Sequence, residues 1–464
     1  MKNPERMSPF ELKAAASLAS IYGLRMLGMF LLLPVFVIYA ERELGASHFQ
    51  AGLALGIYGG TQALLQLPFG MASDRYGRKR MIYLGLLMLV MGSFIAASAH
   101  DITLVIFGRA LQGAGAISAV VMALLADLTR EEHRTKAMAM IGTTIGVTFA
   151  LSLVISSPLN HWIGVPGMFA LTGVLGLIAI AWVRFVIPNP RVSRFHSDAE
   201  AAPAKLKDVL ANTELLRLNF GIFALHAAQM ALFLVIPFAL LKTADIDQNR
   251  HWMIYLPILA GSFVLMLPAI IYGEKKSQLK PVFLTAIALM FIAQLLLAQW
   301  IGQFWGIVLA LSCYFVAFNV LEASLPSLIS KIAPASAKGT AMGVYNTCQS
   351  LGMFLGGVLG GYLAQHYGAA AVFIFCSGLI GLWLIFAFGM QRPPAVRTRL
   401  FHVREMAAER ATALSKQLAK LNGVAEALVV GDEGIAILKI DLRGWDQAAV
   451  EKLIEGEQQH GVSQ

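Results

Sequence analysis

The chain has few charged residues for its length. Of its 464 residues only 14% are Asp, Glu, Lys or Arg, whereas 57% are hydrophobic. Soluble domains carry about 25% charged residues, and a soluble helical core could not cover this much apolar surface. The shortage of charge therefore excludes an ordinary soluble protein and predicts an all-α polytopic membrane protein.

Two further absences exclude classes of site. The three cysteines, Cys313, Cys348 and Cys376, lie in apolar segments without the spacing of a disulfide or metal site. No G-x-x-x-x-G-K-[ST] phosphate-binding motif occurs, which argues against ATP as the energy source. We expect no enzyme activity, no cofactor, no metal and no nucleic-acid partner.

The apolar residues form blocks of 19 or more, long enough to cross a lipid bilayer as helices. Lys and Arg gather before the first block, after the second and after the fourth, so both termini are expected in the cytoplasm. Twelve spans are predicted, at residues 14–40, 49–70, 81–99, 102–128, 137–160, 167–188, 215–241, 252–273, 281–299, 303–330, 338–364 and 369–390.

These spans divide the chain into four parts. We expect a six-helix half over residues 1–188, a polar cytoplasmic linker over 189–214, a second six-helix half over 215–390 and a soluble tail over 391–464. The halves share weak similarity: the segment Pro68–Arg75 aligns with Pro268–Lys275 at the end of the corresponding span. Such an internal repeat is typical of secondary transporters.

The link between the second and third spans carries the most specific motif. Residues Gly70–Arg80 read G-M-A-S-D-R-Y-G-R-K-R, which resembles the loop between helices 2 and 3 of the major facilitator superfamily. Leu27-Gly28 with Pro34-Val35, and Arg109–Gly113 (R-A-L-Q-G), resemble motifs of its twelve-helix drug:proton antiporter family. The resemblance implies two six-helix halves in a bacterial inner membrane, with a small molecule and protons as partners.

The fifth span departs from the antiporter pattern. Residues Gly142–Val147 lack the proline and the closing glycines of the family motif, which leaves uptake open beside export. In the family, the loop aspartate meets the start of helix 11 and the loop arginine pairs with an acid of helix 4. This implies a contact of Asp74 with Lys338–Met342 and a pair of Arg78 with Asp127. The implied conformational motif comprises Gly70, Asp74, Arg75, Gly77, Arg78, Lys79 and Asp127.

Four ionisable residues lie deep in the predicted spans: Arg25, Arg109, His226 and Glu322. Each is in the first helix of a three-helix unit, and superfamily members place these helices around a central cavity. A charge facing lipid costs about 2.5–3.5 kcal/mol, so these residues should face protein or water. We expect all four to take part in proton coupling, with Glu322 as the carrier. Structural pairing and substrate contact are alternatives for Glu322, and hydrogen-bonded packing is the alternative for His226.

Uncharged polar residues on nearby helices are candidates for a substrate cavity. Methionine and aromatic residues around them favour a large hydrophobic ligand. We therefore expect export of hydrophobic or drug-like molecules by alternating access. A sugar or metabolite facilitator or importer, and a sensor that signals through its tail, are the alternatives. The candidate cavity residues are Gln112, Gln229, Asn319, Tyr345, Asn346 and Gln349.

The tail reads as a small soluble domain. Strands are expected at 397–403, 425–430 and 435–442, with helices before Asn422-Gly423 and at 446–455. This βαββα order resembles a ferredoxin-like domain without its last strand. Residues 402–405 lack the cysteines of related metal-binding domains. A core of this size is marginal, so we expect docking on the transporter or self-association.

Overall fold

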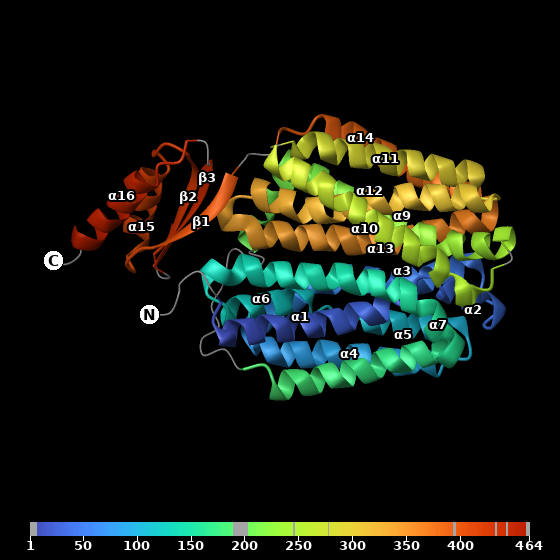
Figure 1. The fold of residues 1–464 in the computed structure, drawn as a ribbon. Helices are drawn as coiled ribbons and strands as arrows, with labels where there is room; N and C mark the ends of the chain where they lie inside the picture. The colour runs from blue at the N-terminus through green and yellow to red at the C-terminus, as the bar shows by residue number, and fades with distance from the viewer. Residues whose placement is uncertain are drawn as a thin grey trace.

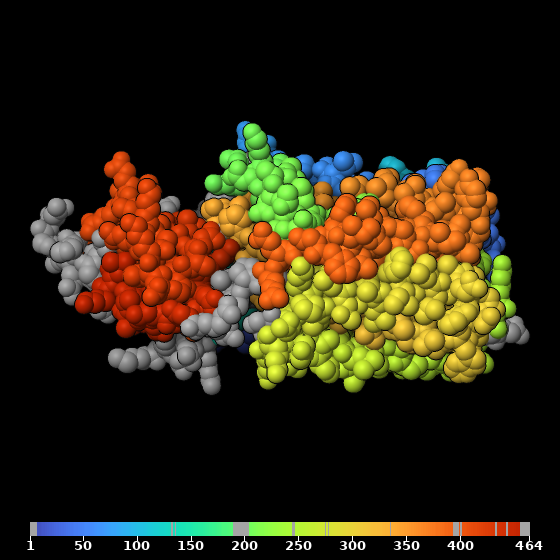
Figure 2. Space-filling model, turned by 90° about the horizontal axis from the view of Figure 1, so that it is seen from above, coloured from blue at the N-terminus to red at the C-terminus, as the bar shows by residue number. Residues whose placement is uncertain are grey.

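The computed structural model describes residues 7–188, 203–244, 246–276, 278–392, 396–431, 434–441 and 444–460. Its described part is an elongated bundle of helices with a small sheet-containing tail at one end (Figure 1). In the space-filling view the tail forms a separate lobe beside the bundle (Figure 2). The predicted linker 189–214 lies largely outside the described residues, which resume with η1 (Pro203–Lys205) and a short helix, α8 (Leu206–Ala211).

The first half of the chain is helical throughout its predicted spans, apart from two short interruptions. A turn at residues 31–35 divides the first span, and a non-helical segment at 115–117 divides the fourth. The fifth and sixth spans share the label α7, but they are two helices joined at Gly164, which has non-helical geometry (φ 65°, ψ 173°). The helices are α1 (Pro9–Phe30), α2 (Phe36–Arg42), α3 (His48–Tyr76), α4 (Arg78–Ala97), α5 (Ile102–Ala114), α6 (Ser118–Leu128) and α7 (Glu131–Phe185).

The second half supplies the remaining six predicted spans, one helix to each. A 3-10 turn, η2 (Gln248–Arg250), precedes the second of these helices, and another, η3 (Ala335–Ala337), links the fourth to the fifth. The helices are α9 (Thr213–Ala244), α10 (Trp252–Lys275), α11 (Leu279–Trp300), α12 (Phe304–Ile332), α13 (Lys338–Tyr367) and α14 (Ala369–Phe388).

Length and composition alone mark eight helices of the described chain as able to cross a membrane. The number is below twelve because α7 contains two predicted spans, α1 and α2 share one, and α3 and α13 are rich in glycine. Those glycines join the two halves. A Cβ on Gly52 would lie 2.2 Å from the carbonyl oxygen of Gly357, and one on Gly56 would lie 2.7 Å from that of Phe354. The backbones of α3 and α13 therefore touch at the end of the bundle away from the tail.

The tail has the predicted βαββα order. Its three strands form an antiparallel sheet in the order β1-β3-β2, and two helices cover one face. Buried Leu414, Leu418, Val450 and Ile454 of the helices pack on that face. The elements are β1 (Val396–His402), α15 (Ala408–Leu418), β2 (Val424–Val430), β3 (Ile435–Asp441) and α16 (Gln447–His460).

Candidate functional site

The predicted loop motif forms a compact cluster of polar side chains where α3 meets α4. Gly77 joins the two helices with φ of 95°, a conformation that favours glycine. The next residue, Arg78, is buried, and its Nε lies 3.3 Å from the fully buried carboxylate of Asp127 on α6. Arg78 also donates to Asp74 and, at 2.7 Å, to Ser73 Oγ. The predicted pairing of Arg78 with Asp127 is confirmed.

Other motif residues lie around this polar cluster. Arg75 is exposed and stacks on Tyr76, whereas Lys79 donates to the carbonyl of Ile187 beyond α7. Gly70 lies against α6, where a Cβ would be 3.5 Å from the Cβ of Ala119.

Asp74 is 46% exposed at its side chain and binds Arg78 one helical turn away. Its expected contact with the start of α13, at Lys338–Met342, stays a prediction. The carboxylate is available for such a contact because its outer side faces solvent.

A second ion pair lies at the same end of the first half and was missed by the sequence reasoning. Glu11, only 3% exposed, accepts hydrogen bonds from the backbone and side chain of Arg130 at 2.8–3.0 Å. Burial alone would raise the pKa of Glu11, but hydrogen bonds from Arg130 and Ser8 lower it to about 2. The local signal was the capping box Ser8-x-x-Glu11 at the start of α1.

Deep in the first half, Arg25 connects three helices. Its Nη1 donates to Ser118 Oγ at 2.9 Å, and its Nη2 donates to Gln62 Oε1 at 2.8 Å. Gln62 in turn donates to Ser350 Oγ of α13 at 3.1 Å. This chain of bonds crosses between the halves, and sequence reasoning identified only its first member, Arg25.

Arg109 occupies a different network of neutral acceptors. It donates to the carbonyl of Ala54 at 3.3 Å and to Gln112 Oε1 at 2.9 Å, while Gln112 donates to Ser93 at 2.8 Å. Arg25 and Arg109 both lie over the ring of Tyr58, at 5.6 and 4.9 Å from its centroid. Arg109 and Gln112 are each 1% exposed, so both serve packing in this conformation.

The second half brings three predicted residues together. His226 Nδ1 lies 3.2 Å from the carbonyl of Ile222, which can only accept, so this nitrogen carries the hydrogen. Its Nε2 therefore accepts from Gln349 Nε2, at 2.7 Å. Glu322 Oε2 lies 3.9 Å from the same ring nitrogen, and its side chain is 32% exposed. A partly accessible acid thus stands beside a neutral, hydrogen-bonded histidine.

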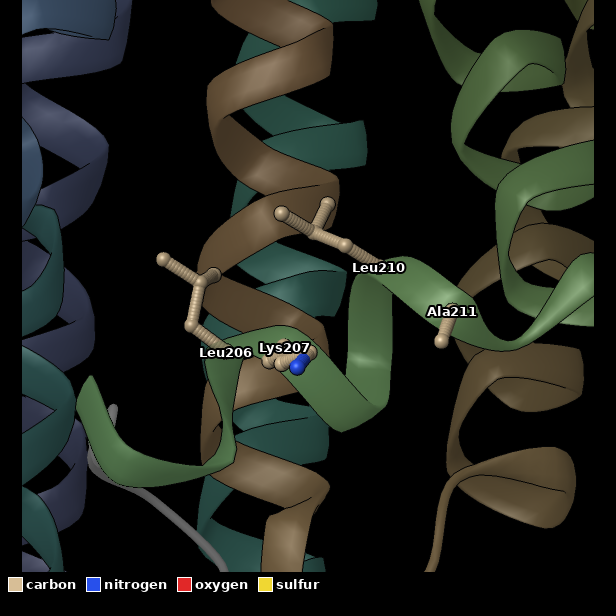
Figure 3. Close-up of a pocket in the computed structure, with 4 residues that line it drawn as sticks. All are labelled: Leu206, Lys207, Leu210 and Ala211. Carbon is tan, nitrogen blue, oxygen red and sulfur yellow. The ribbon is translucent and has the colours of Figure 1, made fainter.

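The other predicted cavity residues are more dispersed. Asn319 of α12 donates to Ser262 of α10 at 2.8 Å. Gln229 and Tyr345 are buried, and Asn346 is half-buried. None of these residues lines the pocket drawn in Figure 3, which lies at Leu206, Lys207, Leu210 and Ala211 of α8. The structure therefore joins Gln349 to His226 and Glu322, and a cavity shared with the other candidate residues stays a prediction.

Comparison with known proteins agrees with this fold. The family model of the Major Facilitator Superfamily matches residues 18–273 and 251–429. The chain belongs to this superfamily. It is 41% identical over 452 residues to the inner membrane transport protein YajR of Escherichia coli (strain K12), covering 97% of this chain and 99% of YajR. The resemblance drawn from the loop motif is thereby confirmed, and the protein is a membrane transporter rather than an enzyme.

More distant relatives extend the comparison. The quinolone resistance protein NorA of Staphylococcus aureus (strain COL) is 24% identical over 363 residues, which cover 75% of this chain and 89% of NorA. A solved bacterial homolog of the human lysosomal transporter Spinster has a TM-score of 0.68 at 13% identity, over 82% of this chain and 97% of its own. At this low identity, the similarity shows a shared fold and nothing about function.

Proposed function

We propose that this superfamily member is a proton-driven secondary transporter that works by alternating access. The supporting observation is the cluster of Glu322, His226 and Gln349. Glu322 is the one carboxylate deep in any predicted span, and it is partly exposed beside the histidine. Intramembrane carboxylates of this kind mark proton relays in transporters.

The cycle follows from the charge of Glu322. When its carboxylate binds a proton from one side, the side chain becomes neutral. A neutral carboxyl costs less to enclose in the low-dielectric interior while the transporter changes conformation. When the opposite side opens, the carboxyl returns the proton to water. His226 adjusts this site, because its Nε2 accepts from Gln349 and would bind a proton only if that amide turned away. Arg25 and Arg109 act as permanent charges in the other half.

The substrate proposed is a hydrophobic or drug-like molecule that is exported. Aromatic side chains from the two halves meet near the middle of the bundle: the ring of Phe149 lies 5.7 Å from that of Phe318 and 6.4 Å from that of Phe315. Such surfaces suit apolar ligands of varied shape. The similarity to NorA, whose name records quinolone resistance, supports the same direction.

Uptake of a sugar or metabolite remains the second candidate because Gly142–Val147 lacks the antiporter proline. The two directions differ in their response to an imposed pH gradient. In proteoliposomes, an antiporter moves its substrate against the flow of protons, whereas a symporter moves it along with them and a facilitator ignores the gradient. Compounds for this assay come from a thermal-shift screen of the purified protein.

The proposal is tested by replacing Glu322 with Gln. This change keeps the size and hydrogen-bonding capacity of the side chain but removes its titration, so proton-driven transport should fall to background while insertion and thermal stability are kept. Glu43→Gln, at an exposed carboxylate after α2, is the matched control and should transport normally. Uphill transport by Glu322→Gln would exclude Glu322 as the carrier.

For the tail, the proposal is a ferredoxin-like domain that modulates transport and does not perform it. The strand order β1-β3-β2 with two helices on one face supports this assignment. Basic links on alternate sides support a bacterial inner-membrane protein with both termini in the cytoplasm. A chain ending at residue 391 should still transport, and loss of transport despite normal insertion would contradict the modulatory role.

A further inference from the structure

The central strand of the tail sheet, β3, is buried on both faces, although the tail's own helices cover only one. Alternation along β3 directs Ala436, Leu438 and Ile440 toward α15 and α16. The intervening residues Ile435 and Lys439 point to the other face, yet they are only 5% and 7% exposed. A lysine is rarely buried without partners. Another part of the chain therefore covers this second face.

The contacts of Lys439 identify that part. Its Nζ donates to the carbonyl of Ala333 and lies 3.4 Å from the carbonyl oxygen of Lys331, both at the end of α12. Its third partner is Glu426 of the neighbouring strand β2, at 3.0 Å. Strand β2 also contacts η3, the turn that follows Ala333. In Figure 1 the sheet accordingly stands between the tail helices and one end of the bundle.

The chemistry of this contact is specific. The last carbonyls of a helix have no partner within the helix and carry partial negative charge, so a cation is favoured there. A lysine ammonium has three hydrogens and no acceptor, and here it has three oxygen partners. An uncharged residue at position 439 would leave both the helix end and Glu426 without this cation.

We propose that the second face of the tail sheet is a docking surface for the link between α12 and α13, residues 333–337, with Lys439 as its anchor. The same strands carry a small apolar cluster of Ile435 and Ile437 with Leu428 and Val430. The functional consequence rests on the proposed proton site: α12 carries Glu322 and α13 carries Gln349. The tail therefore restrains the ends of the two helices that hold the acid and the partner of its histidine.

Hydrogen–deuterium exchange on the full chain in detergent tests the docking directly. In Lys439→Met, the amides of residues 333 and 335–340 should exchange about tenfold faster, the order expected when a charged hydrogen bond is lost. Lys420→Met, at an exposed tail lysine, should leave these amides unchanged. Lys439→Arg keeps a cation and should restore most of the protection. Equal exchange in wild type, Lys439→Met and Lys420→Met would overturn the proposal.

The design guards against unfolding of the tail. Protection of the strand amides at 436–440 reports whether Lys439→Met still folds. If it does not, the chain ending at residue 391 replaces it: without the tail the link should lose its protection, and unchanged protection would again contradict docking. The readout is independent of the proton site. Failure of the Glu322→Gln transport test would end the proposed coupling but leave the exchange result standing.

Discussion

In the first half of the bundle, Arg25 and Arg109 are almost fully buried, and their guanidinium groups bind hydroxyl, amide and carbonyl oxygens. In the second half, Glu322 is about one-third exposed and stands 3.9 Å from a neutral histidine. Guanidinium groups stay charged at any physiological pH, whereas a carboxyl can be titrated. In the proposed function, the first half supplies lasting charge and rigid packing, and the second half supplies the protonation change.

The largest effect on stability is expected at Arg109. Arg109→Ala removes the donors for Ala54, Leu55 and Gln112, so buried acceptors lose their partner and unfolding should become easier by about 2–4 kcal/mol. Arg109→Lys keeps a charge and should lose less stability and less transport. Thermal unfolding in detergent measures the first effect and proteoliposome transport the second.

Glu322→Gln is the matched comparison for Arg109→Ala, since it should remove transport and keep the unfolding temperature. The opposite result, a stable Arg109→Ala protein beside a destabilised Glu322→Gln protein, would reverse the roles assigned to the halves. Equal transport in Arg109→Ala and Arg109→Lys would reduce Arg109 to packing alone.

An intermediate effect on stability is expected at Glu11. It tests whether ion pairs stabilise the first half at its tail-side end. The pKa of Glu11 is lowered from 4.5 to about 2, so the folded state favours its carboxylate. The stabilisation should be complete above pH 4.5 and be lost as the pH falls toward 2. Glu11→Gln should cost about 1–3 kcal/mol at pH 7, measured by thermal unfolding.

The pH series supplies the control for Glu11. As the pH is lowered from 4.5 toward 2, the unfolding temperatures of wild type and Glu11→Gln should converge, because the unfolded state binds the proton first and the folded carboxylate follows only near pH 2. Glu43→Gln, at an exposed carboxylate, should run parallel to wild type throughout. A constant gap between wild type and Glu11→Gln would mean that the packing of the side chain matters and its charge does not.

The helix bundle could be predicted well because the sequence patterns that indicate it lie within single segments. Apolar blocks, the Gly70–Arg80 loop and the deep positions of Glu322 and His226 can each be read within one segment. The contacts it missed join distant segments: Gln62 binds Ser350, and Lys439 binds the end of α12. No periodicity marks such partners. The interruption at residues 115–117 was missed for a related reason, since a Cβ on Gly115 would lie 2.2 Å from the carbonyl oxygen of Gly85 on α4.

The smallest effect is expected at Asp74. Its substitution tests whether the loop motif, which is present in only one half, favours one conformational state. Asp74→Asn removes the charge that now binds Arg78 and that we expect to meet the start of α13 when the tail-side end closes. A carboxylate near a helix N-terminus contributes roughly 0.3–2 kcal/mol, enough to shift the population of the two states severalfold. Paired spin labels across the tail-side ends of the halves should report longer distances in Asp74→Asn. The corresponding link of the second half lacks the motif's glycine and arginine, so Lys276→Gln, at an exposed residue there, should leave the distances unchanged. Identical distances in all three proteins would make the loop a topological anchor and end its role as a conformational lock.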